Sequence, residues 1–594
     1  MEARAFLQAL ALVLCVAAIV TVVFQRLRQP VVLGYVVGGL IVGPHVPVPL
    51  VANAEITHTL SELGVILLLF SLGLELNLRR LARLGAAASL TTVIEVSATA
   101  WLGFVTGRLF GWSTLQSVYA GAIVAISSTT IIVKAFEEQQ VKGKVRDTVL
   151  GILIVEDLVA ILLMALLTPL SRGSGLSTTD LAVTVLRLAG FLAALVVVGL
   201  LVVPRLMRSI VHLNRPETTM IASIGICFAT ALLAGKMGYS LALGAFVAGA
   251  LVAESGETRW IAPVVHPLRD LFVAIFFVSV GMSIDPHLIA RHWSVIAILF
   301  AVVVIGKVGG ATLGCFLMGH GVRTSVQTGM SLAQIGELSF VIAGIGVALG
   351  TIPDSLYAIA VAVSALTTLV TPWFIRLSGP LAALVDRRLP HPIQTFAALY
   401  GTWFEKLRRA PRQARRSAAI MRSARLLLLD ASLVLAIVIG AAVAQAAVAR
   451  TLQGWGLSPA LARLLLAVAV AALTLPFGVG IVRVSKRLGL QLALLALPAM
   501  PAGKLDLAAA PRQALVVTLQ IALVLFVGLP IVALTQPFLG IGTAPVLLAL
   551  VLVLGFVFLR TTVNLEGHVH AGAELIAEAL LAQGRTRAEP PTRL

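Results

Sequence analysis

The chain has 594 residues, of which 59% are hydrophobic and only 12% are charged, and its mean hydropathy is +1.02. This composition, with apolar runs of about 20 residues recurring along the chain, excludes a soluble domain and indicates an all-α polytopic membrane protein. A β-barrel is disfavoured because the runs are long and do not alternate. The net charge of +18 does not indicate a nucleic-acid partner, because Lys and Arg collect in alternate loops. We expect membrane lipids as the surroundings.

Thirteen spans are predicted in residues 1–380, an expected transmembrane domain. In chain order they are Phe6–Phe24, Val31–Leu50, Leu60–Leu76, Ala86–Leu109, Leu115–Phe136, Thr148–Leu170, Leu181–Val203, Thr219–Gly235, Ser240–Ala253, Leu268–Ser283, Ser294–Met318, Val326–Leu349 and Ser355–Ile375. The first span is followed by Arg26 and Arg28 instead of a small-residue cleavage site, so it is predicted to be a transmembrane helix and not a signal peptide.

The loops between these spans alternate in charge. One set carries Arg26/Arg28, Arg79/Arg80/Arg83, Lys142/Lys144/Arg146, Arg205/Arg208/Arg215, Arg259, Arg323 and Arg376/Arg387/Arg388, and the other set carries only Arg172, Lys236 and Arg291. Because cytoplasmic loops are enriched in Lys and Arg, this pattern places the N-terminus outside and the end of the thirteenth span in the cytoplasm. We expect a multi-pass protein of a bacterial-type inner membrane with a cytoplasmic C-terminus.

The remainder of the chain is divided into three predicted parts. Residues 381–425 include many Arg and Lys after Phe404, and they are interpreted as a basic cytoplasmic helix on the anionic leaflet or as a solvated basic linker. Residues 426–560 carry four further spans, near Leu426–Val448, Leu464–Val482, Ala514–Thr535 and Ala544–Leu559. Residues 561–594 form a predicted cytoplasmic tail. Its Glu566, His568 and His570 are interpreted either as a metal-binding or pH-sensing group or as ordinary tail residues. The absence of further ligands in the tail sequence favours the second interpretation.

Glu156 and Asp157 lie near the middle of an otherwise almost uncharged span. A rise of 1.5 Å per residue places them roughly 13 Å into a hydrocarbon core about 30 Å thick. A carboxylate there costs on the order of 2.5–3.5 kcal/mol, so an intramembrane acid is a functional-site hypothesis. Lys307 is similarly central in its own span. Two acids and one ammonium at membrane depth indicate a protonatable ion-binding site.

Two spans are predicted to be interrupted. The fifth has a hydroxyl cluster at its centre, Ser127-Ser128-Thr129-Thr130, and the twelfth reads Gln334-Ile335-Gly336-Glu337 at its centre. Such segments mark unwound points whose carbonyls and helix ends bind ions. A hydroxyl cluster alone is usually bonded to its own helix, but one interruption in each half of the core is the pattern of an inverted repeat. Glu337 is interpreted either as a structural partner or as part of the ion path.

Several motifs resemble the cation/proton antiporter-2 family, which includes bacterial sodium/proton antiporters and potassium efflux antiporters. They are Leu33 to Pro44 (LGYVVGGLIVGP), Phe70 to Glu75 (FSLGLE), Val155-Glu156-Asp157, Gly244 to Gly249 (GAFVAG), Phe276 to Met282 (FFVSVGM) and Gln334 to Phe340 (QIGELSF). They occur in the family's order over residues 1–380. The resemblance implies a homodimer with a dimerisation part and a mobile core that carries its ion site by an elevator movement. It also implies two broken crossing helices.

The resemblance also implies roles for individual residues. Asp157 matches the carboxylate that binds either cation or proton, and Lys307 matches the lysine that electrogenic members place beside the acids. Glu156 stands where relatives have Asp, Asn or Gln. With Ser127, Ser128 and Thr129 as hydroxyl donors, Asp157 and Glu156 are the expected ligands of the transported metal cation. We expect Lys307 to pair with Asp157 or Glu156 when the site holds a proton.

The predicted function is exchange of a monovalent cation, K⁺ or Na⁺, for protons, with no enzymatic reaction and no cofactor beyond the transported ions. One alternative is a gated potassium efflux channel on the same fold, and another is a non-transporting membrane sensor. Glu95 is alone in its span and is interpreted either as a relay or as a packed, protonated or partnered acid. Glu75 and Asp285 lie close to span ends and are interpreted as interfacial anchors.

Overall fold

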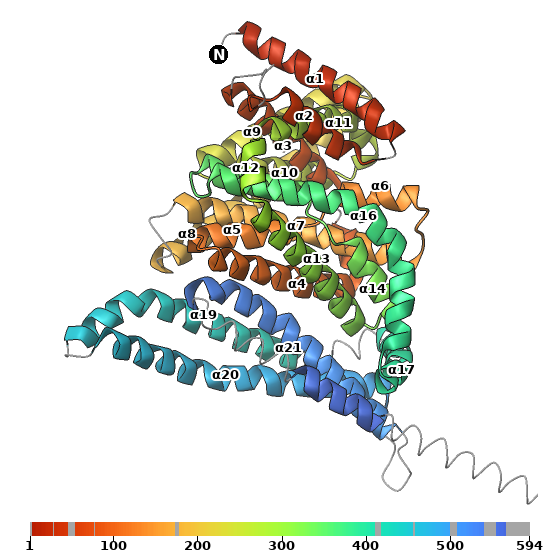
Figure 1. Ribbon diagram of the computed structural model, residues 1–594, viewed down its shortest axis with the longest axis vertical. Helices are drawn as coiled ribbons and strands as arrows, with labels where there is room; N and C mark the ends of the chain where they lie inside the picture. The colour runs from red at the N-terminus through yellow and green to blue at the C-terminus, as the bar shows by residue number, and fades with distance from the viewer. Residues whose placement is uncertain are drawn as a thin grey trace, which may run out of the picture. The chain divides into compact units, whose positions relative to one another are not determined.

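Figure 1 shows the computed structural model, which describes residues 3–27, 29–45, 54–75, 78–172, 178–409, 417–454, 458–498, 508–539 and 554–565. Within these ranges the regular structure is helical and no strand occurs. The all-α prediction is therefore confirmed.

The helices of the first 390 residues are α1 (Ala3–Arg26), α2 (Val31–Val42), α3 (Ala54–Glu75), α4 (Leu78–Leu109), α5 (Thr114–Val124), α6 (Thr129–Glu138), α7 (Lys144–Arg172), α8 (Thr178–Val211), α9 (Pro216–Lys236), α10 (Leu241–Ala253), α11 (Thr258–Met282), α12 (Pro286–Arg291), α13 (Trp293–Leu317), α14 (Val322–Ser331), α15 (Glu337–Ala348) and α16 (Asp354–Arg388). They are followed by α17 (His391–Arg409), α19 (Ala418–Gly454), α20 (Pro459–Ala496) and α21 (Ala509–Leu539).

The chain forms two compact units. The first comprises residues 1–311 and 327–378, and the second comprises residues 312–326 and 379–594. Among the described residues, 12 helical segments are long and apolar enough to cross a membrane, and four shorter apolar helices accompany them, Val31–Val42, Leu241–Ala253, Glu337–Ala348 and Leu554–Leu565. The prediction of a multi-pass membrane protein is therefore confirmed.

Each of the thirteen predicted core spans coincides with a helix or with a pair of short helices. The fifth span is α5 followed by α6, and the twelfth is α14 followed by α15. The helix of the second span, α2, ends at Val42 before Gly43 and Pro44, and the last predicted residues of this span, 46–50, lie outside the described residues. The short helix α12 was not predicted, since six residues carry no measurable period; it begins where Asp285 Oδ1 accepts a hydrogen bond from His287 N at 2.8 Å.

Glycines set the closest helix contacts of the first unit. A Cβ added to Gly39 of α2 would lie 2.0 Å from Val278 O of α11, and one added to Gly281 would lie 2.1 Å from Val36 O. The same reciprocal contact joins α3 to α10, where Cβ atoms at Gly73 and Gly249 would lie 2.2 and 2.1 Å from the carbonyl oxygens of Phe246 and Phe70. Small residues let membrane helices approach to backbone contact, which compensates for the weak hydrophobic drive between helices in lipid.

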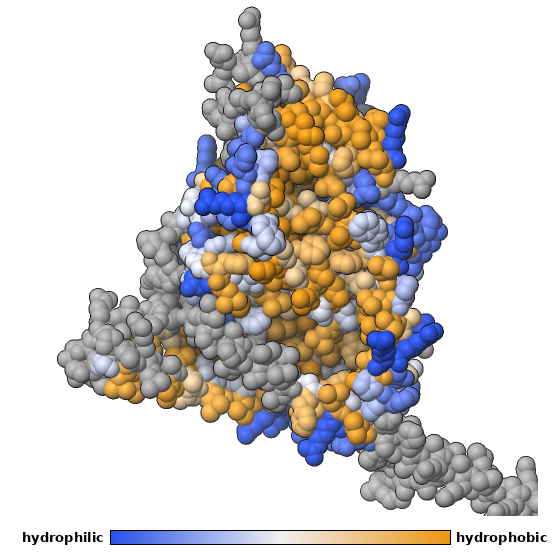
Figure 2. All heavy atoms as spheres, in the orientation of Figure 1, coloured by the Kyte–Doolittle hydropathy of each residue, from blue (hydrophilic) through white to orange (hydrophobic). Residues whose placement is uncertain are grey.

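The surface of the first unit is largely apolar. Figure 2 shows hydrophobic residues spread over much of its visible face, with polar residues gathered mainly toward the edges. On α8, consecutive large side chains are exposed, including Val196, Val197, Val198, Leu200 and Leu201. Exposed apolar side chains of this density fit contact with lipid, because a soluble surface would present polar groups.

The second unit has its own core. Phe396, Tyr400 and Trp403 of α17 are buried with residues of α20 and α21, and Tyr400 Oη donates a hydrogen bond to Leu317 O at 2.6 Å. Of the predicted basic segment from Phe404 to residue 425, the first residues belong to α17 and the last to α19, and residues 410–416 lie outside the described ranges.

Three of the four predicted C-terminal spans fall within α19, α20 and α21. Of the fourth, only the helix Leu554–Leu565 is described. Glu566, His568 and His570, together with the rest of the predicted tail beyond residue 565, lie outside the described residues.

Candidate functional site

The two predicted interruptions meet at one point in the first unit. The backbone between α5 and α6 crosses the backbone between α14 and α15, where Gly336 N donates a hydrogen bond to Ile126 O at 2.8 Å and Gln334 Nε2 donates one to Ser128 O at 3.0 Å. Ser127 Oγ donates to Leu332 O at 3.1 Å. Each interruption therefore satisfies polar backbone groups of the other, which no lipid can do. The prediction of two broken crossing helices is confirmed.

Gly336 makes this crossing possible. A Cβ at this position would lie 2.4 Å from Ser127 O and 2.5 Å from Ser127 C. These are backbone atoms, which cannot turn aside as a flexible side chain can. The glycine in the predicted break is therefore required by close approach of the two chains.

The crossing brings two helix N-termini together with two carboxylates. Ser128 caps α6 by accepting a hydrogen bond from Ile131 N at 3.2 Å, and its hydroxyl donates to Glu337, the first residue of α15. Thr130 Oγ1 also donates to Glu337, at 2.9 Å, and Thr129 Oγ1 donates to Asp157 Oδ2 at 3.0 Å. Helix N-termini carry partial positive charge, so both carboxylates lie where an anion is stabilised.

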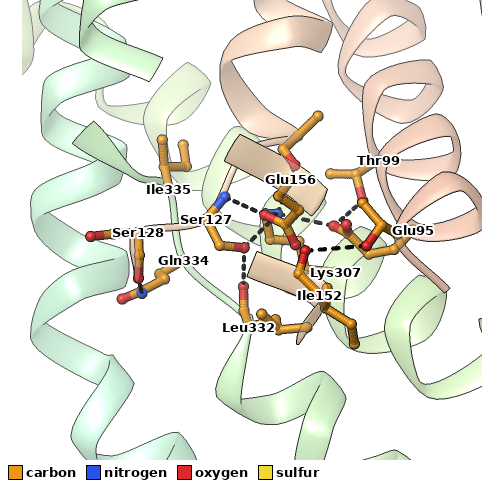
Figure 3. Close-up of polar contacts among 12 residues, drawn as sticks. Glu95, Thr99, Ser127, Ser128, Ile152, Glu156, Lys307, Leu332, Gln334 and Ile335 are labelled. Carbon is orange, nitrogen blue, oxygen red and sulfur yellow. Dashed lines mark hydrogen bonds and ion pairs between the residues drawn. The ribbon is translucent and has the colours of Figure 1, made fainter. Parts of the chain in front are cut away.

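Lys307 lies at a helix C-terminus, that of α5. Its Nζ donates to Ser127 Oγ at 2.8 Å and to Glu95 Oε1 at 2.9 Å (Figure 3). It also donates to Ala125 O at 2.8 Å. Ala125 follows the last residue of α5, where the helix dipole favours a cation. Lys307, Glu95 and Glu156 have no exposed side-chain surface.

Glu156 is held from two sides. Its Oε2 accepts a hydrogen bond from Ser127 N at 2.7 Å and lies 3.6 Å from Lys307 Nζ. Lys307 and Glu156 therefore form an ion pair, whereas no ion pair joins Lys307 to Asp157 within the described part of the chain. The reason is geometric: consecutive helical residues point about 100° apart, so Glu156 faces Lys307 while Asp157 faces Thr129.

The hydroxyl groups of the first break bind different partners. Ser127 and Ser128 were predicted to supply oxygens to a cation together with Asp157, but Ser127 Oγ lies between Lys307 Nζ and Leu332 O, and Ser128 Oγ binds Glu337 and Ile131 N. Thr129 is the hydroxyl beside Asp157. Asp157 is half-buried and Thr130 is exposed, so this side of the crossing is more accessible than the side of Lys307.

Glu75 and Asp285 lie apart from the crossing. Glu75, the last residue of α3, pairs with Arg269 at 3.1 Å, and Asp285 caps α12. Glu95 lies beside the crossing and accepts a hydrogen bond from Lys307, which agrees with its interpretation as a partnered acid. The sequence reasoning did not identify Gln334 as a brace of the crossing, although its position in the second break was a signal; its Oε1 accepts from Thr371 Oγ1 at 2.9 Å.

Two cavities of the first unit approach the site along α15. A cavity of about 800 Å³ is lined by the acidic residues Glu62, Asp285 and Asp354 and by Phe340 and Val341 among others. Phe340 also lines a small cavity that includes Glu337. Asp157 is not among the residues lining the large cavity, so in this conformation that cavity approaches the crossing without reaching the half-buried carboxylate.

The fold and the site define a class of protein, a multi-pass membrane protein whose interrupted helices cross beside ionisable side chains. A family model described as the transmembrane region of sodium/hydrogen exchangers matches residues 11–377. The match covers more than half of the chain, and the chain belongs to this family.

Named relatives and a solved structure agree with this assignment. The chain is 32% identical over 368 residues to YbaL of Escherichia coli and 31% identical over 373 residues to K(+) efflux antiporter 5 of Arabidopsis thaliana, covering 60% and 62% of this chain. It spans 66% of the length of each relative, just under two thirds. The sodium proton antiporter MjNhaP1 from Methanocaldococcus jannaschii superposes with a TM-score of 0.52 at 17% identity, over 64% of this chain and 99% of that one, which shows a shared fold.

Proposed function

We propose that this protein exchanges a monovalent cation for protons across a membrane and that Asp157 is the carboxylate that binds either ion. The single observation that supports this role most is the set of contacts that Asp157 makes. It accepts a hydrogen bond from the Thr129 hydroxyl at the N-terminus of α6 and forms no ion pair with Lys307. A carboxylate whose nearest polar partner is a hydroxyl can take a proton or a dehydrated alkali cation, since oxygen donors suit hard cations.

Coupling follows from the charge at membrane depth. With a proton or a cation bound, the charge of Asp157 is neutralised and the mobile part crosses the membrane; empty, the carboxylate resists transit because an unpaired charge in hydrocarbon is costly. The proposed movement is an elevator-type displacement of the crossing helices in a homodimer, and no cofactor is required. Glu156 and Glu337 lie on either side of the same crossing and contribute to the negative potential that attracts the cation.

The proposed substrate is K⁺ or Na⁺. The name of the Arabidopsis relative, K(+) efflux antiporter 5, favours potassium as the first ion to test. A monovalent ion fits a site in which one carboxylate carries the exchange, because a single neutralisation suffices for transit.

The experiment uses purified protein in liposomes with an imposed pH gradient followed by a pH-sensitive dye. Addition of K⁺ or Na⁺ is expected to collapse the gradient for the wild type and not for Asp157→Asn, because the amide binds neither proton nor cation in the same way. Asp147→Asn is the matched control, since Asp147 lies in the first turn of the same helix α7 and is exposed. If neither cation acts, or if Asp157→Asn exchanges at the wild-type rate, the exchange proposal is wrong. Cation flux without proton movement would favour the channel alternative.

A further inference from the structure

Glu95 is a buried acid to which the exchange chemistry above assigns no role. It lies on α4, 212 residues from Lys307 in the chain, yet its Oε1 is 2.9 Å from Lys307 Nζ. Both side chains are 0% exposed. A buried carboxylate without a compensating partner is strongly destabilising, so this contact is a specific feature of how α4 and α13 pack.

Two glycines of α13 allow this packing. A Cβ at Gly310 would lie 2.9 Å from the Cα of Glu95, and a Cβ at Gly306 would lie 3.0 Å from Thr99 Oγ1. These glycines flank Lys307 on its own helix, and the close approach they permit places the carboxylate of Glu95 within reach of the ammonium. Thr92 Oγ1 donates to Ile152 O at 3.2 Å and connects α4 to α7, the helix that carries Glu156 and Asp157.

The contacts of Lys307 show which partner holds it. A lysine ammonium has three donors, and here they reach Glu95 Oε1, Ala125 O and Ser127 Oγ at 2.8–2.9 Å. Glu156 Oε2, at 3.6 Å, is within electrostatic range but outside hydrogen-bond distance. A move of the ammonium to Asp157 would break three hydrogen bonds of a fully buried ammonium, each costly to leave unmade.

We propose that Glu95 is a positioning residue of the exchange site: it holds the Lys307 ammonium on α4 beside the end of α5, so that the ammonium stays in place through the cycle and does not compete with the cation for Asp157. This inference rests on the proposed exchange at Asp157. In the alternative cycle, Lys307 pairs with the transport carboxylate and is released when the cation binds. In the cycle proposed here, Lys307 keeps its contact with Glu95 throughout. Glu95 also adds a negative charge to a group that contains Glu156, Asp157, Glu337 and one ammonium.

The first test compares exchange kinetics of Glu95→Gln, Glu95→Asp and the control Glu217→Gln, an exposed acid in the first turn of α9. In Glu95→Gln the ammonium has only Glu156 as a charged partner and the site loses one negative charge. The apparent KM for the cation is expected to rise on the order of ten- to hundredfold, with a smaller change in the maximal rate. Glu95→Asp is expected to restore part of the affinity, because it keeps the charge, and the control is expected to behave like the wild type. A wild-type KM in Glu95→Gln would overturn the proposal.

The second test is a double-mutant cycle on the melting temperature of Glu95→Gln, Lys307→Met and the double variant. Glu95→Gln is expected to lower the melting temperature in the wild-type background and to have little effect, or to raise it, in the Lys307→Met background. An equal loss in both backgrounds would mean that Glu95 does not act through Lys307. This measurement needs no transport, so absence of exchange in the wild type would count against the proposed function while the cycle still decides the role of Glu95.

Discussion

At the scale of single residues, each charged or hydroxyl side chain of the crossing is matched to a helix end or to an opposite charge. Lys307 lies at the C-terminal end of α5, while Asp157 and Glu337 lie at the N-terminal ends of α6 and α15. Since helix dipoles favour cations at C-termini and anions at N-termini, the arrangement lowers the cost of holding charges at membrane depth.

Ser128→Ala tests this matching at one residue. The variant removes the cap of α6, a loss of about 1–2 kcal/mol, and leaves Glu337 without one of its two hydroxyl donors. We expect a lower melting temperature and a slower exchange rate. Ser113→Ala is the control, because Ser113 caps α5 through Gln116 N at 3.2 Å at an exposed site and has no carboxylate partner there. Equal melting temperatures for the two variants would show that the bond from Ser128 to Glu337 adds nothing to stability.

At the scale of helices, the family motifs in the sequence correspond to places where backbones touch. Gly39, Gly73, Gly249 and Gly281 belong to four of the motifs, and each faces a carbonyl oxygen of another helix at a distance that admits no Cβ. Their requirement is therefore steric and not chemical. It also explains why a sequence pattern without functional groups identifies the fold.

Gly336→Ala and Gly344→Ala are expected to have opposite effects although both lie at or in α15. The first substitution places a Cβ 2.4 Å from Ser127 O. This overpacking is expected to cost roughly 1–3 kcal/mol of stability and to push the two interrupted segments apart. The second meets nothing within 4 Å in a helix interior, where alanine is favoured over glycine by roughly 0.5–1 kcal/mol. Melting temperatures of the two purified variants check this. A Gly336→Ala protein as stable as the wild type would show that the crossing is looser than described.

At the scale of the whole molecule, the candidate site and the C-terminal helices belong to different compact units. All the residues of the crossing, with Glu95 and Lys307, belong to the first unit, whereas residues 312–326, which include the end of α13 and the start of α14, belong to the second. Within that second unit the connecting segment is held by the Tyr400 to Leu317 hydrogen bond and by rings of α17 around Phe316. The chain therefore passes from the first unit into the second within α13 and returns to the first unit within α14.

A chain that ends at Ser378 tests this division. Removal of α17 leaves Phe316 and the Leu317 carbonyl without their partners, so we expect a lower melting temperature and a lower yield of folded protein. The protein that does fold is expected to keep a cation KM within a few-fold of the wild type, because every residue of the crossing is retained. A large shift in KM with unchanged stability would assign the C-terminal helices a part in ion binding.

The sequence by itself determined the membrane class, the helical segments of the core, the two interruptions and the central position of Glu156, Asp157 and Lys307 within their apolar segments. These features depend on local quantities, the length of apolar runs and the position of a polar residue within them, which can be read along the chain. The limits of individual helices were less predictable, as at the early end of α2, because caps and turns depend on a few residues.

Only the tertiary structure decided which partners these residues have. Lys307 bonds to Glu95 across 212 residues, Asp157 faces Thr129 and not the ammonium, and Ser127 and Ser128 bind protein groups instead of standing free for a cation. Each pairing depends on how closely two helices approach and on which way a side chain turns about its helix. These properties arise from glycine contacts between distant segments, so spacing along the chain does not contain them.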